Sequence, residues 1–461
     1  MERLPIEITH MVFANLKGRP RGIARLRLVC KTFAAIGLHY LVPELHLIFI
    51  SGSFERLREI SEHPIISQHV ETLFYEADTL TSYETMRQWK NSIVVPPWLE
   101  SIPGDQLDPP SATASEREHR AYMRNIQKLR AGPRYTQSEK HLKFVYETYR
   151  NYLSDQAKLR ACDYNAEVIR EAMARMPNLK EIALSMEYCL YEGRSGVLER
   201  AFANVYQSAF GDDGQSESCG VPQMRSLLLG ASHAGLKLEV LRCGIVHWEI
   251  FRQDTEVFAQ MRNAVRNLKT LQLHITTRIS DEELAYEDGD DYHSQIPACA
   301  KYLKESGRMR ELVTAAPNLR SLDITFDCQY PYPPAGLKES VGGLTWHSLK
   351  NVAFGIVETT EDELMDYYTR HASTLEAVRL DTIKLTKGSW PRLFQRMRKA
   401  LSLTEALICG HVTSDNPFEE FNFYFPVLGD VVEKYLIAGG DGPLLDLDAF
   451  LGDTDSELEP V

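Results

Sequence analysis

The sequence predicts an α/β fold in which a small helical unit at the N-terminus precedes an irregular solenoid of strand–helix repeats. Three observations support this prediction. Residues 4–41 hold apolar residues at helical spacing, and a short apolar phrase recurs in the second half of the chain. The 461 residues are 44% hydrophobic and 25% charged, which is typical of a chain with a large ordered core.

Composition divides the chain into five segments. Residues 1–45 form the helical unit, 46–95 a connecting α/β segment, 96–176 a Pro-rich loop and a helical insertion, 177–438 the repeat region, and 439–461 an acidic tail. Five Pro between residues 96 and 114 indicate a loop. The tail has six acidic residues and no Lys or Arg from Asp446 onward, a composition typical of disorder.

The N-terminal unit has the pattern of two or three short helices. Pro5 suits a first helical turn, and the stretch "KGRPRG" (17–22) interrupts the apolar spacing. A unit of ~40 residues rarely stabilises itself without metal or disulfide. Leaving its large apolar side chains exposed would cost about 1.5–3 kcal/mol each relative to burial. We therefore expect this unit to bind another polypeptide, with a cap on the first edge of the solenoid as the alternative.

The recurring phrase has the form L-x-x-L-x-L, with apolar residues at offsets 0, 3 and 5. Offsets 3 and 5 lie on one side of a strand, so both side chains enter the same core. With helices between the copies, this is the signature of leucine-rich repeats. Spacings of 45, 44, 51, 30 and 26 indicate that the earlier repeats carry insertions or belong to another irregular β/α stack. The copies begin at Leu179, Met224, Leu268, Leu319, Leu349 and Leu375.

One helix between two copies has a clear start signal. The stretch "EDELMDYYTRHA" follows Thr360, and Thr360 with Glu363 has the form of a capping box. We therefore expect a helix that begins here and covers one flank of the repeat sheet.

Charge and cysteine usage exclude several classes of protein. The formal net charge of −13 argues against phosphate binding over a broad surface, so we expect no nucleic-acid partner. No run approaches the ~20 apolar residues that cross a bilayer, and the start "MERLPIEITH" has no apolar signal core. None of the eight Cys forms a C-x-x-C pair, which argues against structural zinc. We expect no membrane partner and a location in the cytoplasm, the nucleus or both.

Catalytic and metal-binding motifs are missing from the sequence. It contains no H-E-x-x-H, no G-x-x-x-x-G-K-[ST] and no G-x-S-x-G. The acidic "EDGDDY" (287–292) lacks the ligand order of a calcium loop, and "GGDG" (439–442) reads as a flexible turn. We therefore predict no enzyme, no catalytic residue, no cofactor and no metal, and an unrecognised active site is the weakest hypothesis.

Residues 4–41 resemble an F-box motif. The matching features are Leu4-Pro5, Glu7-Ile8, Val12-Phe13 and Leu16, then "LRLVCKTF" (26–33) and Ile36. The rest of the chain is similar to the irregular repeat region of F-box proteins common in filamentous fungi. The resemblance implies a substrate-recognition subunit of an SCF-type cullin–RING ubiquitin ligase, docked on its Skp-family linker protein and, through it, on the cullin. The residues that would form or support the docking face are Leu4, Pro5, Ile8, Phe13, Leu26, Val29, Cys30 and Phe33.

The competing hypothesis is a repeat scaffold that binds a protein partner outside any ligase. Residues 17–31 carry six cationic side chains with no acidic residue between them. This cluster suits an acidic partner surface, or it is a solvated helix face. The sequence does not identify the protein substrate. The candidate recognition segments are the insertions at 185–222 and 276–310 and the aromatic-rich loop 327–336.

Overall fold

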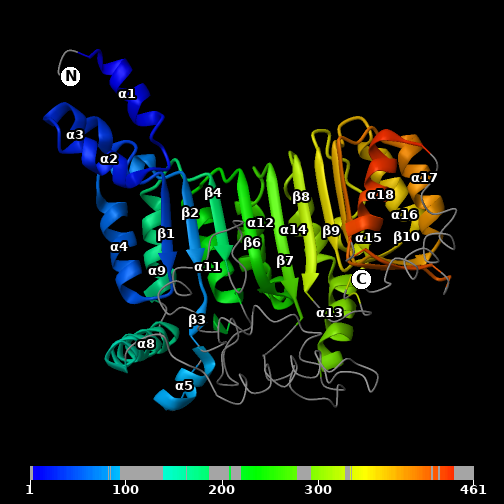
Figure 1. Ribbon diagram of the computed structural model, residues 1–461, viewed down its shortest axis with the longest axis horizontal. Helices are drawn as coiled ribbons and strands as arrows, with labels where there is room; N and C mark the ends of the chain where they lie inside the picture. Colours follow the sequence, from blue (N-terminus) through cyan, green and yellow to red (C-terminus); the bar gives the residue numbers. More distant parts are fainter. Residues whose placement is uncertain are drawn as a thin grey trace, which may run out of the picture.

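The fold is built on a sheet of nine parallel strands. The structure is a computed structural model, and it describes residues 4–80, 82–83, 85–93, 139–161, 164–185, 207–208, 220–277, 292–327, 333, 335–416, 419–423 and 426–440. The strands lie side by side in chain order, all pointing the same way (Figure 1). They are β1 (Glu44–Ile48), β2 (Thr72–Glu76), β4 (Glu181–Ser185), β6 (Val240–His247), β7 (Thr270–Thr276), β8 (Ser321–Asp327), β9 (Asn351–Gly355), β11 (Ala377–Asp381) and β13 (Glu405–Cys409).

The apolar phrase places one strand in each repeat. The residues at offset 3 face each other across all nine strands in continuous parallel register, from Leu45 in β1 to Ala406 in β13. The residue at offset 0 is buried just before its strand in every repeat except the first, where Val42 is partly buried. The nine offset-0 residues are Val42, Val70, Leu179, Leu238, Leu268, Leu319, Leu349, Leu375 and Leu403.

One predicted copy is wrong. Met224 lies in helix α11 (Val221–His233), not in a strand, and the strand of that repeat is β6. The apolar residues of "QMRSLLL" continue at helical spacing to Ala231, and Met224, Leu227 and Ala231 are all buried on one side of the helix. The true phrase begins at Leu238, with Cys243 at offset 5, which a search for Leu alone passes over.

The repeat region begins at β1, well before the predicted boundary at residue 177. Strands β1 and β2 pair with each other and β2 pairs with β4, so both belong to the same sheet. Successive offset-0 residues are 28, 109, 59, 30, 51, 30, 26 and 28 positions apart, by subtraction of their numbers. Five intervals thus share a basic period of 26–30 residues. The 109-residue interval after β2 separates the first two repeats from the rest and hid them from the sequence pattern.

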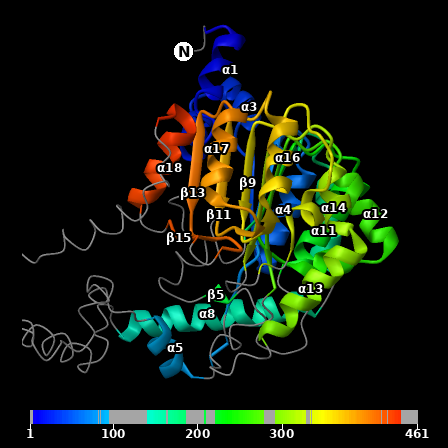
Figure 2. The same ribbon diagram turned by 90° about the vertical axis from the view of Figure 1, so that its right-hand side faces the viewer.

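Helices cover one face of the sheet and close a single core. Figure 2 shows α11, α12, α14 and α16 on the same side. One continuous apolar cluster runs from Leu45 to Leu436 through the described residues. The helices between or after strands are α4 (Ser51–Glu62), α9 (Tyr164–Ala174), α11, α12 (Thr255–Ala264), α13 (Tyr292–Ser306), α14 (Arg308–Thr314), α15 (Leu337–Val341), α16 (Glu361–His371), α17 (Trp390–Ala400) and α18 (Pro426–Ala438), with short 3-10 helices at Ile66–His69 and Trp248–Arg252. We call this assembly of sheet and helices the solenoid.

The last three repeats share a left-handed turn at the end of each strand. Ile356, Thr382 and Gly410 have φ of 52°, 53° and 73°. The amide of Ile356 donates to the Asp381 carbonyl, and that of Thr382 to the Cys409 carbonyl. This turn leads the chain into a second sheet, which consists of β10 (Glu358–Thr360), β12 (Lys384–Lys387), β14 (His411–Thr413) and β15 (Glu420–Asn422).

The predicted capping box at the start of α16 is confirmed. The Glu363 amide donates to the Thr360 hydroxyl at 3.1 Å, and the Thr360 amide donates to the Glu363 carboxylate at 3.3 Å. The predicted Pro-rich loop and acidic tail lie outside the described residues, apart from Gly439 and Gly440.

A smaller cluster lies below the carboxyl ends of the first strands (Figure 1). It joins α8 (Glu139–Arg160) to α5 (Met86–Ile93) and β3 (Thr79–Leu80), which pairs with β5 (Gln207–Ser208). Trp89 and Tyr149 lie at its centre. The buried Gln156 amide ties α8 to the chain by accepting from Leu80 N and donating to Asp78 O. Of the predicted helical insertion (96–176), α8 packs mainly in this smaller cluster, whereas α9 belongs to the solenoid core.

An exposed apolar surface on the N-terminal hook

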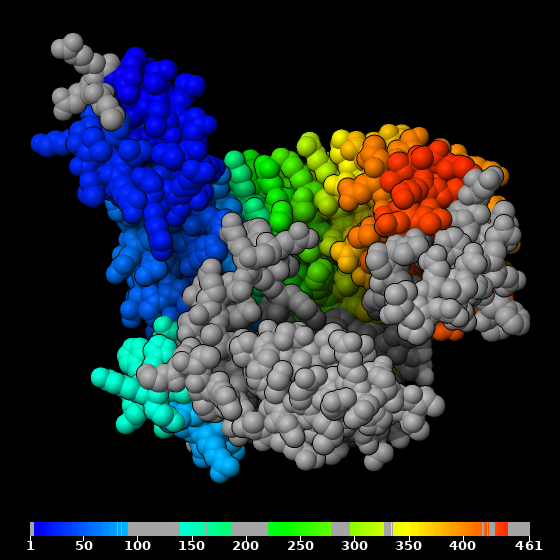
Figure 3. Space-filling model, in the orientation of Figure 1, coloured from blue at the N-terminus to red at the C-terminus, as the bar shows by residue number. Residues whose placement is uncertain are grey.

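The first 38 described residues form a helical unit that we call the hook (residues 4–41). It consists of α1 (Ile6–Ala14), α2 (Pro20–Arg27) and α3 (Lys31–Leu38). Figure 3 shows it projecting from one end of the molecule. Its four fully buried apolar residues form a cluster separate from the solenoid core, so the hook has its own small core. They are Phe13, Ile23, Phe33 and Ile36.

Packing inside the hook explains its local sequence. The rings of Phe13 and Phe33 meet edge to face, with centroids 5.6 Å apart. Cys30 caps α3, because its Sγ accepts from the Phe33 amide. Gly37 lies where α3 crosses α1 and α2: a Cβ there would come within 2.8 Å of Arg27 Cδ and 3.0 Å of Phe13 Cε1. A larger residue at position 37 would push the three helices apart.

The hook leaves most of its other large apolar side chains exposed. Among the described residues, ten large apolar side chains are strongly exposed, and seven of these belong to the hook. Leu28 is 86% exposed, Met11 60% and Val29 55%. A cluster of this kind on a well-packed protein marks an interaction surface. The seven residues are Leu4, Ile6, Ile8, Met11, Val12, Leu28 and Val29, and we call them the exposed apolar surface.

The residues predicted for docking fall into three groups. Leu4, Pro5, Ile8 and Val29 are exposed. Leu26 and Cys30 are half-buried against the hook core. Phe13 and Phe33 are buried within that core, so they can support the surface but cannot touch a partner.

Sequence reasoning missed the most exposed residue of the surface. Leu28 lies in the three-residue connection between α2 and α3, beside Val29. Helical periodicity says nothing about a connection. A pair of aliphatic residues in a turn that normally holds polar residues was the available signal.

Exposed cationic side chains lie in the same small unit as the exposed apolar surface. Arg19, Arg21, Arg25 and Lys31 are exposed, and none of them forms an ion pair with a described residue. Lys17 differs because its Nζ lies 2.6 Å from the Glu71 carboxylate in the solenoid. The hook therefore combines exposed apolar area with positive charge.

Polar contacts join the hook to the solenoid. His39 Nδ1 lies 2.6 Å from His69 Nε2 in the solenoid. Within the hook, His10 Nδ1 lies 3.0 Å from the Tyr40 hydroxyl. Burial lowers the pKa of His39, and the neighbouring imidazoles of His69 and His10 lower it further. The junction therefore favours the neutral form of His39.

Nothing in the described residues forms a metal site of three or more His, Cys, Asp or Glu. His39 contacts His69, whereas His46 contacts Glu44, so these two histidines do not share a site. The acidic stretch 287–292 lies outside the described residues except for the backbone of Tyr292. In the parts of the chain that the structure describes, no helix combines the length and apolar character needed to cross a membrane.

Comparison with solved structures gives distant likenesses to known proteins. The leucine-rich repeat-containing protein LegL7 from Legionella pneumophila is 12% identical, with a TM-score of 0.29 over 87% of this chain and 100% of that chain. The assignment of a repeat solenoid rests on the strand order and register described above. No protein-family model and no curated protein matches the sequence, so the F-box resemblance stays a prediction.

Proposed function

We propose that this protein is a substrate-recognition subunit of an SCF-type cullin–RING ubiquitin ligase. The hook binds a Skp-family linker protein, through which it joins the cullin, and the solenoid holds a protein substrate. Such a subunit catalyses no reaction itself. It raises the local concentration of the substrate beside a separate enzyme. The proposal includes no cofactor, no nucleic-acid or membrane partner, and a cytoplasmic or nuclear location.

The exposed apolar surface is the single observation on which the proposal depends. Burying side chains such as Leu28 and Met11 against a partner would gain about 1.5–3 kcal/mol each. The exposed arginines of the hook favour a partner with an acidic surface and would speed its approach. A surface of this composition fits protein docking better than any small-molecule chemistry.

The separate core of the hook argues against a pure capping role. A terminal cap covers the apolar edge of a repeat array and shares its core. Here Phe13 and Phe33 pack within the hook, and the contacts to the solenoid include a salt bridge and a histidine pair. A repeat scaffold that binds another partner through the same surface is the second candidate, because the surface itself does not name its partner.

A binding experiment with full-length protein and a purified Skp-family linker separates these candidates. We expect wild-type protein to retain the linker. The Leu28→Asp/Val29→Asp variant should weaken binding by about a hundredfold or more, because two carboxylates would be desolvated in an apolar interface. Both side chains are exposed, so this variant should keep the thermal stability of the wild type.

Phe144→Asp is the matched control. Phe144 is 65% exposed on α8, outside the hook, and its replacement should leave linker binding unchanged. If wild-type protein does not retain the linker, the ligase proposal fails and the repeat scaffold stands. If the double variant still binds as the wild type does, the docking site lies elsewhere.

A further inference from the structure

The hook is the cationic end of an acidic protein. It holds six Lys and Arg and a single acidic residue, Glu7. Of the formal net charge of −13, the hook contributes +5 and residues 1–3 contribute nothing, so residues 42–461 carry −18. The exposed cations of the hook therefore attract acidic segments of the same protein.

Residues 441–461, which we call the acidic segment, combine negative charge with apolar residues. They follow the described part of the chain and hold seven Asp or Glu and no Lys, Arg or His. In "LLDLDAFLGD" (444–453), Leu444, Leu447 and Leu451 are spaced three and four apart. This is the spacing at which an amphipathic helix presents apolar anchors to an apolar surface. The acidic segment thus has the two properties that complement the hook.

The acidic segment is too short to cover the hook of its own chain. It begins after α18, which packs against β13, at the opposite end of the sheet from the hook (Figure 1). Eight strand-to-strand steps separate β1 from β13, roughly 38 Å at about 4.8 Å a step. From Gly440, a fully extended chain reaches Leu444 within ~14 Å and Leu447 within ~25 Å. A second copy's hook is therefore the surface within reach.

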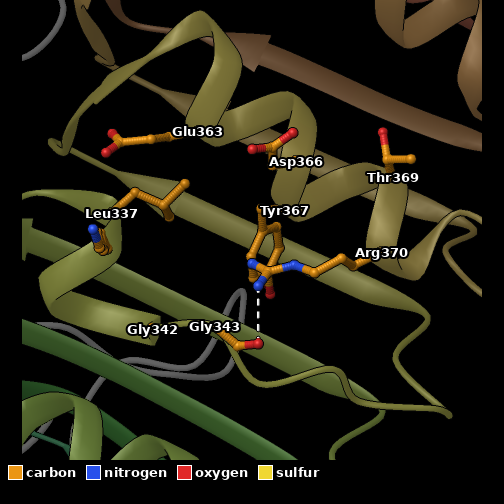
Figure 4. A pocket seen from close by; sticks show the side chains of 9 residues that line it. Leu337, Gly342, Gly343, Glu363, Asp366, Tyr367, Thr369 and Arg370 are labelled. Carbon is orange, nitrogen blue, oxygen red and sulfur yellow. Dashed lines mark hydrogen bonds between the residues drawn. The ribbon is translucent and has the colours of Figure 1, made fainter.

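The α15–α16 cavity suits an acidic segment less well than the hook does. This cavity, of about 660 Å³, lies between α15 and α16 and is lined by Glu363 and Asp366. Figure 4 shows these two carboxylates on the α16 side, whereas Arg370 donates to the Gly343 carbonyl at 2.9 Å. Two acidic side chains would repel an acidic segment. Of these two surfaces, the hook is the better complement.

We propose that the acidic segment of one copy of this chain docks on the exposed apolar surface of a second copy's hook. Leu444, Leu447 and Leu451 cover apolar side chains such as Leu28 and Val29, and the intervening acidic residues pair with the arginines. Two copies that exchange segments form a dimer with two such contacts. Because the proposed function assigns the same surface to the linker protein, self-association and linker binding would exclude each other. Only this last consequence rests on the proposed function.

Sedimentation equilibrium of the full-length protein tests the inference. We expect the wild type to self-associate reversibly. The hook variant, Leu28→Asp/Val29→Asp, and the segment variant, Leu447→Asp/Leu451→Asp, should each weaken self-association about a hundredfold or more, because carboxylates would be desolvated in an apolar contact. Raising NaCl from about 0.05 M to about 0.5 M should weaken wild-type self-association about tenfold, since salt screens the charges.

Mixing the two variants identifies the contact. The hook variant keeps an intact acidic segment, and the segment variant keeps an intact hook. Each should stay monomeric alone, and an equimolar mixture should form a complex of one copy of each through a single contact. This complex would also show that neither variant lost self-association by misfolding. Phe144→Asp, which places a carboxylate on the exposed face of α8, is the matched control and should self-associate within about twofold of the wild type.

A wild type that stays monomeric would overturn the inference, as would either variant associating as tightly as the wild type or a mixture that forms no complex. The assay contains no linker protein, so the two proposals fail separately. Self-association by a wild type that does not bind the linker would defeat the ligase proposal alone. Linker binding by a wild type that stays monomeric would defeat this inference alone.

Discussion

The solenoid buries its large apolar side chains, whereas the hook leaves most of its own exposed. The solenoid buries them in one cluster that runs from Leu45 to Leu436. The hook has a core of four residues and carries seven of the ten strongly exposed large apolar side chains among the described residues. A unit of ~40 residues has too little interior to enclose so many. The comparison teaches that a unit this small leaves apolar side chains exposed because its interior cannot hold them; in the proposed function, the linker protein would cover them.

The largest expected contrast comes from one substitution made in both regions. Leu271 is fully buried in the central strand β7, and Leu28 is the most exposed apolar residue of the hook. Leu271→Ala should lower the free energy of unfolding by about 2–5 kcal/mol. Leu28→Ala should change it by about 0.5 kcal/mol or less. Chemical denaturation measures both, and equal losses would show that the hook surface is packed in solution.

A pair of glycines gives the next contrast. Gly410 has φ of 73°, and a Cβ there would lie 2.5 Å from Asp381 Oδ1 and 2.9 Å from Thr382 N. Gly410→Ala should therefore cost roughly 2–4 kcal/mol. Gly22 lies in α2, where a Cβ would meet only Arg19 Cβ at 3.8 Å. Gly22→Ala should stabilise the hook by about 0.5–1 kcal/mol, as its thermal unfolding would show.

Acid should weaken the solenoid through Glu361. Burial alone would raise the pKa of this carboxyl, but hydrogen bonds from Arg392, Arg396 and the Ser389 amide outweigh it and lower the pKa to about 2. The stabilisation is present above the ordinary pKa of 4.5 and is lost as the pH falls toward 2. Glu361→Gln should cost about 1–2 kcal/mol at pH 7, since both arginines are partly exposed. The variant should also flatten the stability profile between pH 5 and pH 2, and an unchanged profile would contradict this role.

The smallest expected effect lies at the junction of the two regions. The pKa of His39 is lowered from its ordinary 6.5, so the junction is fully stable above that pH and weakens as the pH falls through the lowered pKa. The groups that face His39 are His69, His10 and, through His10, Tyr40. The Glu71 and Thr72 amides donate to Pro43 O. Their protection from hydrogen exchange, measured relative to the intrinsic rate, should be lower at pH 5.5 than at neutral pH. His39→Phe should remove this loss of protection at pH 5.5. If the variant loses protection as the wild type does, His39 is not its source.

Much of the solenoid follows from the sequence because its repeats depend on local spacing. Leu268, Leu319, Leu349 and Leu375 each mark a strand, as the pattern predicts. The pattern fails where a different residue fills the position. Cys243 and Ala406 occupy core positions in β6 and β13, and both are too small or too polar to score as Leu.

The hook shows a different limit of sequence reasoning. Spacing identifies which residues are apolar, but it does not say which of two apolar faces turns inward. Phe13 and Phe33 face the hook core, and Ile8 and Met11 on the same helix as Phe13 face solvent. Deciding between them needs the angles at which three short helices cross, and these depend on contacts such as the approach of Gly37 to Phe13.

Because the strands follow one another in chain order, each repeat adds one strand spacing to the length of the solenoid. Six strand-to-strand steps separate β1, beside the hook, from β9, which lies between α15 and α16 in the chain. At about 4.8 Å a step, they set these two places roughly 29 Å apart along the sheet. Gain or loss of one repeat would shift that distance by a single step and leave both ends intact. Gain or loss of repeats during evolution can therefore change the length of the sheet in discrete steps, while the residues at its two ends stay the same.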